Sequence, residues 1–280
     1  MIVRYRTPGA TIGVGLLDGD QVVELGADVA SLLRMTLLEL RTMVDLARSG
    51  PARPLSEVEI LAPVDGRTEV WAAGVTYLTS QSARIEESET SASVYEQIYD
   101  ADRPELFFKS VAWRVIGPGG EIRARADSPI DVPEPELALA VNASGEVVGY
   151  AVCNDVSSRS IEAENPLYLP QAKVYNGSCA LGPGIIPAWE VADPYALPLR
   201  LTIVREDAVV WDGSASTAQL HRRLDQLVAW LHRELDFPDG VWLSTGTCLV
   251  PDLPFTLADG DVVTIAIDGV GTLINTVRRS

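Results

Sequence analysis

Histidine and cysteine are scarce in this chain of 280 residues, which has two histidines and three cysteines. The cysteines, Cys153, Cys179 and Cys248, form no C-x-x-C pair and are odd in number, which is typical of reduced structural thiols rather than a disulfide framework or a zinc site. His221 and His232 both fall in a segment with an amphipathic helical pattern, where we expect structural roles. A mechanism that needs a histidine base therefore has few places to find one.

Basic charge and long apolar runs are also missing. The chain has 22 lysines and arginines against 39 aspartates and glutamates, a formal net charge of −17, so most of its surface would repel nucleic-acid phosphates and anionic membranes. No apolar stretch approaches the roughly 18 to 20 residues that cross a bilayer, and the start "MIVRYRTPGA" lacks the apolar core of a signal peptide. These absences favour a cytoplasmic protein that acts on a small molecule, with no nucleic acid and no membrane as partner.

Residues 1–65 have the pattern of a small N-terminal α/β domain. Alternating strands flank an Asp-Gly turn signal at 18–19. A helix is predicted over 36–50, with Thr36 as its N-cap and a Gly-Pro stop at its end. The stretch 51–66 has the composition of a linker.

Residues 66–280 are rich in β-forming segments, and we predict that they form one large sheet-based domain. Two helical patterns interrupt the strands. The polar pattern at 80–102 suits an exposed lid-like segment, and the pattern at 216–235 carries a leucine stripe that would pack on a sheet. Antiparallel-looking strands with few helices indicate an α+β fold and argue against a doubly wound β-α-β fold.

Three carboxylates stand where a hairpin could bring them together. Glu134 and Glu136 are two positions apart in a predicted strand, so they share one face, while Leu137, Leu139 and Val141 take the other. A turn near residue 144 would return the chain so that Asp155 lies on the glutamate face.

The exact turn leaves two registers open. If the turn residues are 143–144, Glu134 lies opposite Cys153. If they are 144–145, Glu134 lies directly opposite Asp155. Both registers keep Asp155 on the face of the two glutamates.

Ionised carboxylates this close repel one another unless a cation lies between them. Oxygen ligands without histidine or cysteine select Mg²⁺, Mn²⁺ or Ca²⁺, and an open octahedral site with three protein oxygens leaves positions for water or a chelating substrate. The pattern therefore predicts a divalent metal site. The alternative is that the three residues form the solvated face of an exposed hairpin.

Five motifs, in this order, resemble the fumarylacetoacetate hydrolase superfamily: EPELALAV, GEVVGYAVCNDVSSR, QAKVYNGSCALGPGIIP, STGTCLVPD and GDVVTIAIDGVGTLINTV. The resemblance covers about residues 70–280. It implies a mixed β-sandwich roll of the C-terminal type of that family, a small N-terminal domain, one Mg²⁺ or Mn²⁺ held by three carboxylates, and usually a homodimer. On this sequence the implied metal ligands are Glu134, Glu136 and Asp155.

Other segments are similar to one branch of that family, the 2-keto-3-deoxy-pentonate dehydratases. Members that hydrolyse carbon-carbon bonds carry a histidine where this chain has Ser80, so the hydrolytic dyad is missing. The similarity implies that Glu105, in "RPELFFK", is the general base and that Lys173 contacts the substrate. The substrate is then a 2-keto-3-deoxy sugar acid, which loses water to leave a 2,5-dioxo acid.

The expected substrate-binding residues are Thr76, Gly246, Thr247 and Arg84. Thr247 resembles the position that hydrogen-bonds the substrate carboxylate. Arg84 suits a bidentate contact with the same acid, although it could instead pair with Glu87 on the same helical face. A 2-keto acid can chelate the metal through its carboxylate and keto oxygens, which stabilises the enolate formed when a proton leaves C3.

We therefore predict a metal-dependent lyase. The second hypothesis is an acylpyruvate-type hydrolase or an oxaloacetate decarboxylase that uses the same enolate chemistry, and the third is a catalytically silent binding protein. Ser160 stands where an acidic residue is common in the family, and Asn176 where aspartate is frequent. These two departures leave the range of substrates open.

Overall fold

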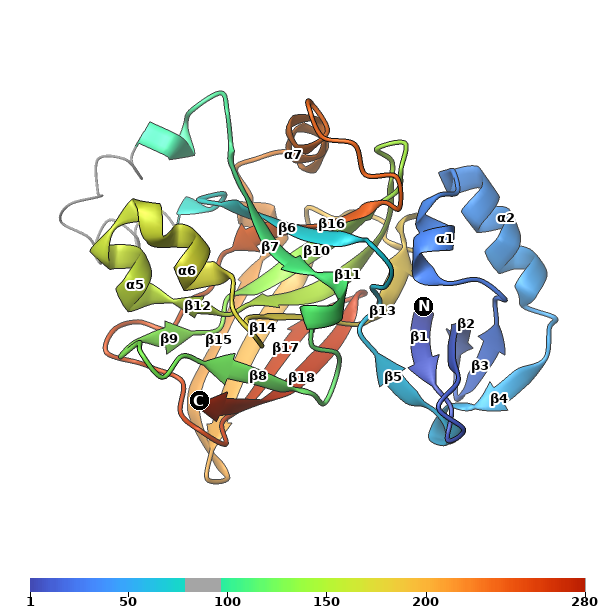
Figure 1. Cartoon of the computed structure of the whole chain (residues 1–280), viewed down its shortest axis with the longest axis horizontal. Helices are drawn as coiled ribbons and strands as arrows, with labels where there is room; N and C mark the ends of the chain where they lie inside the picture. The colour runs from blue at the N-terminus through green and yellow to red at the C-terminus, as the bar shows by residue number, and fades with distance from the viewer. Residues whose placement is uncertain (79–96, 280) are drawn as a thin grey trace.

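The computed structural model describes residues 1–78 and 97–279 (Figure 1). Mixed sheets dominate this part of the chain, and the helices are few and short. The α+β fold predicted from the sequence is confirmed. The α-helices are α1 (Val29–Leu33), α2 (Leu37–Ala47), α5 (Arg159–Glu164), α6 (Leu169–Lys173) and α7 (Leu224–Leu231).

The largest sheet runs from the N-terminal strands to the centre of the larger part of the molecule (Figure 1). Its strands, in spatial order, are β4 (Ala52–Pro54), β3 (Gln21–Glu24), β2 (Ile12–Asp18), β1 (Ile2–Arg6), β13 (Cys179–Pro187), β11 (Val147–Asp155), β10 (Pro135–Val141), β16 (Val241–Thr247), β6 (Glu69–Gly74) and β7 (Glu105–Val111), with β5 (Glu59–Leu61) beside β1. Because β1 pairs with β13, the sheet crosses the predicted division at 65–66. That division stays a prediction.

The N-terminal unit confirms one local prediction and corrects another. Thr36 caps α2 as expected, since its hydroxyl accepts a hydrogen bond from the amide of Glu39 at 3.3 Å while the Glu39 carboxylate accepts one from the Thr36 amide at 2.9 Å. The stretch 51–66 is not a linker, because it contains β4 and β5, which pair with β3 and β1. Strands of three residues are too short for a period-2 pattern to show.

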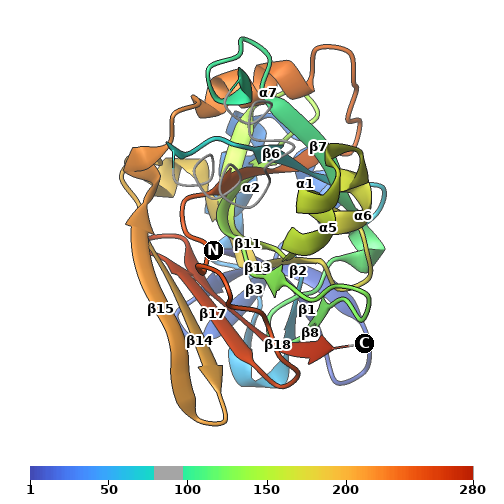
Figure 2. The ribbon, with the colours of Figure 1, turned by 90° about the vertical axis from the view of Figure 1, so that its left-hand side faces the viewer.

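A second sheet packs against the larger part of the first (Figure 2). Leu137, Leu139 and Val141 of β10 point into the core between the two sheets. Ala138 and Ala140 point to the opposite face, into the core that the N-terminal unit shares. Both faces of β10 are therefore buried, which explains its continuous apolar sequence. The second sheet consists of β15 (Ala208–Ser216), β14 (Pro198–Arg205), β17 (Val262–Ile267), β18 (Gly271–Arg279) and β8 (Glu121–Ala124).

The helix predicted over 216–235 is shorter than expected. Only α7 is α-helical there, and Leu235, counted in the stripe, is exposed beyond its end. Before α7, the amide of His221 donates to the carbonyl of Thr76 at 2.9 Å, a bond to a distant segment that a continuous helix would not permit. The leucine periodicity was correct, but this tertiary bond interrupts the helix.

The β10–β11 hairpin has a three-residue loop and a bulge, neither of which was predicted. Its loop is 143–145, with Gly145 at φ +80°, so neither predicted two-residue turn is formed. A bulge between Ala140 and Val141 then shifts the pairing by one residue. The amide of Asp155 donates to the carbonyl of Glu134 at 2.9 Å, as the 144–145 alternative predicts.

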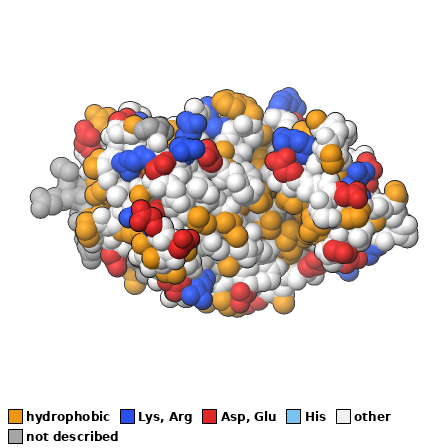
Figure 3. All heavy atoms as spheres, turned by 90° about the horizontal axis from the view of Figure 1, so that it is seen from below, with side chains coloured by type: hydrophobic (Ala, Val, Ile, Leu, Met, Phe, Trp, Pro, Cys, Tyr) orange, Lys and Arg blue, Asp and Glu red, His pale blue; other side chains and the backbone are white. Residues whose placement is uncertain are grey.

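The surface and the thiols agree with the composition. Figure 3 shows acidic and basic side chains interspersed on the face seen from below. None of the described helices combines the length and the apolar character needed to span a bilayer. Cys153, Cys179 and Cys248 are buried and form no disulfide bond within the described residues, as predicted, and burial raises the pKa of the Cys248 thiol to about 12.

Beside the hairpin lies a two-stranded sheet of β9 (Asp131–Val132) and β12 (Ser157–Ser158). The carboxylate of Asp131 is fully buried, and its ion pair with the Arg279 guanidinium is loose, at 3.8 Å. Burial raises the pKa of Asp131 to about 6 from an ordinary value of 3.8. The folded protein therefore binds this proton more tightly than the unfolded chain between about pH 4 and 6.

We predict that Asp131→Asn stabilises the protein near neutral pH. The contribution of Asp131 to the free energy of unfolding should fall as the pH rises from 4 to 6, because the folded state must then bury a charged carboxylate. The neutral amide avoids this cost, so the variant should gain on the order of 2 kcal/mol at pH 7.5 and little at pH 4. Urea denaturation at both pH values measures the difference. An equal difference at both values contradicts the prediction.

Candidate metal centre

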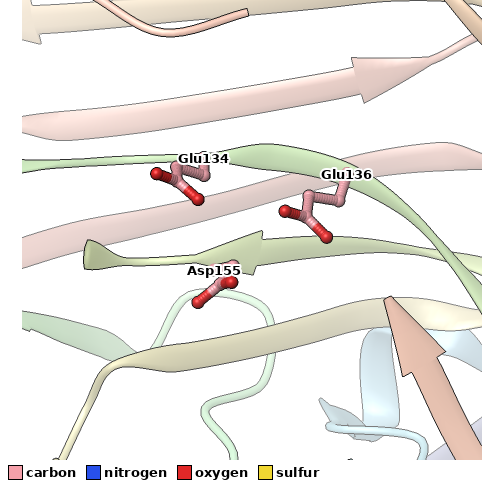
Figure 4. A group of neighbouring side chains, drawn as sticks. All are labelled: Glu134, Glu136 and Asp155. Atoms are coloured by element: carbon pink, nitrogen blue, oxygen red, sulfur yellow. The ribbon is translucent and has the colours of Figure 1, made fainter. Parts of the chain in front are cut away.

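Three buried carboxylates converge at the end of the β10–β11 hairpin (Figure 4). Glu134 precedes β10, Glu136 lies within it, and Asp155 ends β11. One oxygen from each lies within 4.8 Å of the others, and the residues are 2%, 2% and 1% exposed. The alternative of an exposed, solvated hairpin face is therefore wrong, because other elements cover both faces of these strands.

Glu136 is held by hydroxyl and backbone donors. Its Oε2 accepts from Ser244 Oγ at 2.5 Å and from the amide of Gly246 at 2.8 Å. A bulge in the β10–β16 pairing, with Gly246 at φ +91°, turns that amide toward the carboxylate. Burial, with the charge of Asp155 adding to it, raises the pKa of Glu136 well above its ordinary value. A divalent ion would relieve both effects.

Two buried cations, Lys173 and Arg159, contact the other carboxylates. Lys173 ends α6, and its Nζ donates to Glu134 Oε2 at 2.6 Å, Asp155 Oδ2 at 3.2 Å and Ser157 Oγ at 2.5 Å. Arg159 Nη1 donates to Glu134 Oε1 at 2.8 Å. Sequence reasoning placed Lys173 here but missed Arg159, which directly follows the strand pair that carries Ser157.

Lys109 is a third cation, which sequence reasoning also missed. Its Nζ forms an ion pair with Asp155 Oδ1 and donates to the carbonyls of Val156 at 3.0 Å and Lys173 at 2.6 Å. A bulge in the β6–β7 pairing falls at this residue. The available signal was a lysine inside the apolar strand 105–111, since lysine is almost never fully buried unless it is paired.

Glu105, the expected base, begins β7 opposite Gly74. A Cβ at Gly74 would lie 2.0 Å from Glu105 Oε2, so the carboxylate lies across that glycine. Phe107, two residues on and therefore on the same face of β7, has its ring 5.6 Å from Lys173 Nζ. The structure thus places Glu105 on the face of β7 that is turned toward the centre.

The expected substrate-binding threonines contact backbone in this structure. Thr76 Oγ1 donates to the carbonyl of Thr245 at 2.6 Å, and Thr247 Oγ1 donates to that of Leu249 at 3.0 Å. Thr247 is paired with Glu136 across the sheet, so it lies beside the triad. Arg84 and Ser80 lie outside the described residues.

The donor set fits a hard divalent cation. All three candidate ligands are carboxylates, and neither sulfur nor imidazole belongs to the group. Three carboxylates suit Mg²⁺ or Mn²⁺ with its remaining positions open, whereas Ca²⁺ takes six to eight oxygens. Glu134, Glu136 and Asp155 would therefore hold the ion.

Two family models match the chain. A model described as "Fumarylacetoacetate (FAA) hydrolase C-terminal" matches residues 70–278, and one described as "Rv2993c-like, N-terminal" matches residues 1–63. The chain belongs to the fumarylacetoacetate hydrolase family. The resemblance drawn from its motifs is confirmed.

Relatives in this family carry names from the predicted branch. The chain is 50% identical to "Probable 2-keto-3-deoxyxylonate dehydratase" of Haloferax volcanii over 215 residues. This alignment covers 77% of this chain and 73% of that protein. It is 38% identical over 287 residues to "2-dehydro-3-deoxy-D-arabinonate dehydratase" of Saccharolobus solfataricus, over 99% and 96% of the two chains. It is also 26% identical over 302 residues to a human "Oxaloacetate tautomerase", over 99% of this chain and 91% of that one.

Solved structures of the family show the same fold. A "2-keto-3-deoxy-D-arabinonate dehydratase complexed with magnesium and 2,5-dioxopentanoate" superimposes with a TM-score of 0.86 at 35% identity, over 100% of this chain and 99% of that one. Its apo form gives a TM-score of 0.87 at 34% identity, with the same coverage. The predicted β-roll with a small N-terminal domain is confirmed.

We predict that Glu136→Gln weakens Mn²⁺ binding at least about 100-fold, because it removes the negative charge of one of the three carboxylate ligands. Isothermal titration of metal-stripped protein measures the dissociation constant. Glu121→Gln, at an exposed carboxylate that pairs with Arg278, is the matched control and should bind Mn²⁺ like the wild type. Equal affinity of the Glu136 variant and this control contradicts the assignment.

Proposed function

We propose that this protein is a Mg²⁺-dependent hydro-lyase that removes water from a 2-keto-3-deoxy sugar acid. The observation that carries the proposal is the buried triad of Glu134, Glu136 and Asp155, whose oxygens lie within 4.8 Å of one another. Relatives named as dehydratases of such acids, at 38% identity over nearly the whole chain, support the reaction type. The magnesium and 2,5-dioxopentanoate of the related structure support the cofactor and the product class.

The reaction must remove one proton from C3 and the hydroxyl from C4. When bound, Mg²⁺ supplies Lewis acidity to the carboxylate and keto oxygens of a 2-keto acid, which makes the C3 proton acidic. The hydroxyl leaves C4 with one further proton, so one water is lost in total. A proton shift from C5 to C3 then gives the C4–C5 enol, and transfer of the C5 hydroxyl proton to C4 gives the 2,5-dioxo acid.

Glu105 is the proposed base that takes the C3 proton. Its carboxylate lies on the face of β7 turned toward the centre, at the open start of the strand, and Gly74 opposite it provides the space. A carboxylate is a suitable base here because the proton it removes is adjacent to a polarised carbonyl.

Lys173 is the proposed cation that faces the developing negative charge. Its ammonium is 1% exposed and already bridges Glu134 and Asp155, so its position is fixed before substrate arrives. To contact the substrate directly it must exchange one of its three present partners. The rest of the substrate is proposed to bind to Thr76, Gly246, Thr247 and Arg84.

The hydrolase alternative requires a histidine that activates water, and no histidine lies at the carboxylate centre in the described part of the chain. The chain has two histidines. His221 stacks on Tyr99 at 4.1 Å and faces Asp100 at 3.4 Å, while His232 caps α7 and packs on Phe237. These contacts support the structural roles expected for both histidines. Neither histidine contacts a residue of the triad, so neither is positioned as a water-activating base.

Product analysis tests the function directly. We expect the Mg²⁺-loaded protein to convert a 2-keto-3-deoxy-pentonate, tested as each of the two C4 enantiomers, to a 2,5-dioxo acid, and ¹³C NMR follows the product. Metal-stripped protein should be inactive and recover with Mg²⁺. Cleavage of acetylpyruvate, or decarboxylation or enolisation of oxaloacetate, without any dehydration would replace the proposal with the corresponding alternative.

We predict that Gly74→Ala displaces the base without harming the metal centre. The new Cβ would meet Glu105 Oε2 at 2.0 Å, so the carboxylate must move. Turnover should fall at least about tenfold, as it does for a misplaced catalytic group, and Mn²⁺ affinity should stay within about twofold of the wild type. Glu105→Gln should lose more turnover, roughly 100-fold or more, with the same affinity. Wild-type turnover in Glu105→Gln would exclude Glu105 as the base.

The expected homodimer and the cytoplasmic location belong to this proposal as well. Family resemblance supports the first, and composition supports the second. Sedimentation equilibrium of the purified protein tests the dimer, with a mass of twice 30.2 kDa expected.

A further inference from the structure

We propose that Lys109 is a positioning residue whose buried charge weakens the hold of the centre on its metal ion and leaves more of the ion's charge to act on the substrate. The inference rests on the metal site of the proposed function. It assigns Lys109 no contact with substrate.

The contacts of Lys109 separate it from the substrate. It is 0% exposed, and its ammonium is surrounded by Asp155 Oδ1 and by the carbonyls of Val156 and Lys173. The ammonium donates to the two carbonyls and lies within ion-pair distance of Asp155 Oδ1, so its charge faces that carboxylate. Lys109 is therefore held in place beside Asp155, and it affects the metal ion through the charge of that carboxylate.

The charges around the triad are balanced before any ion binds. Three carboxylates (Glu134, Glu136 and Asp155) meet three cations (Lys109, Lys173 and Arg159), each within ion-pair distance of a triad oxygen. A divalent ion would raise the sum to about +2. A 2-keto acid brings one negative charge and its enolate brings two, so the loaded centre matches the enolate better than the substrate.

Without Lys109 the balance changes in a defined direction. The sum before metal binding becomes about −1, and in a buried site of low dielectric this excess favours a divalent cation strongly. The loaded centre then carries about +1, which no longer offsets both charges of the enolate. Metal affinity should rise while turnover falls, and a residue that merely holds Asp155 in place would lower both.

The test uses two neutral variants of the full-length protein. Lys109→Met removes the charge and the donors at similar volume, and Lys109→Gln keeps an N–H donor for the carbonyls. Arg205→Met is the control, since it removes a cation from an ion pair with Asp261 on the second sheet. Mn²⁺ binding to metal-stripped protein is measured by titration calorimetry, and as the rise in melting temperature that saturating Mn²⁺ causes.

We expect both Lys109 variants to bind Mn²⁺ at least about tenfold more tightly than the wild type, to gain more melting temperature from it, and to lose at least about tenfold in kcat. The control should change neither quantity. Unchanged or weaker Mn²⁺ binding in the variants overturns the proposal. If the wild type shows no dehydration, the proposed function fails, while the Mn²⁺ affinities still decide the role of Lys109.

Discussion

The repulsion between three buried carboxylates is the constraint on which the rest of the centre depends. Glu134, Glu136 and Asp155 are too close and too dry to be ionised together without positive charge beside them. The protein supplies this charge with three buried cations, and it supplies two polar donors to Glu136. The converging oxygens still offer three hard ligands to a divalent ion, which would support enolate chemistry on a 2-keto acid.

The fold meets this constraint by irregularities in otherwise regular strands. Register shifts fall in β10 near the hairpin loop, in β16 beside Gly246 and in β7 at Lys109. The last two direct the Gly246 amide and the Lys109 side chain at the carboxylates, as bulges beside functional sites commonly do. Val75, a β-branched residue at φ +51°, precedes Thr76 in the same region and shows that the backbone there is held in a costly conformation.

Local patterns were sufficient to predict the fold class, the cap of α2 and the shared face of the triad. These follow from period 2, from capping chemistry and from ordered motifs, all of which lie within short stretches of sequence. Lys109 and Arg159 were missed, because their partners lie 25 to 64 residues away. A lysine within the apolar strand 105–111 is a local sign of a buried charge, but it does not identify the partner. The late start of α7 was missed for the same reason, since the hydrogen bond from the His221 amide to the Thr76 carbonyl prevents a helix from 216 onward.

The most direct test of a divalent ion within the triad is an anomalous difference map from crystals soaked in Mn²⁺, recorded at the manganese edge. The account predicts one peak bonded to an oxygen from each of Glu134, Glu136 and Asp155, with Lys109 still beside Asp155. A map with no peak among the three carboxylates, and with Lys173 still bridging Glu134 and Asp155, would contradict it.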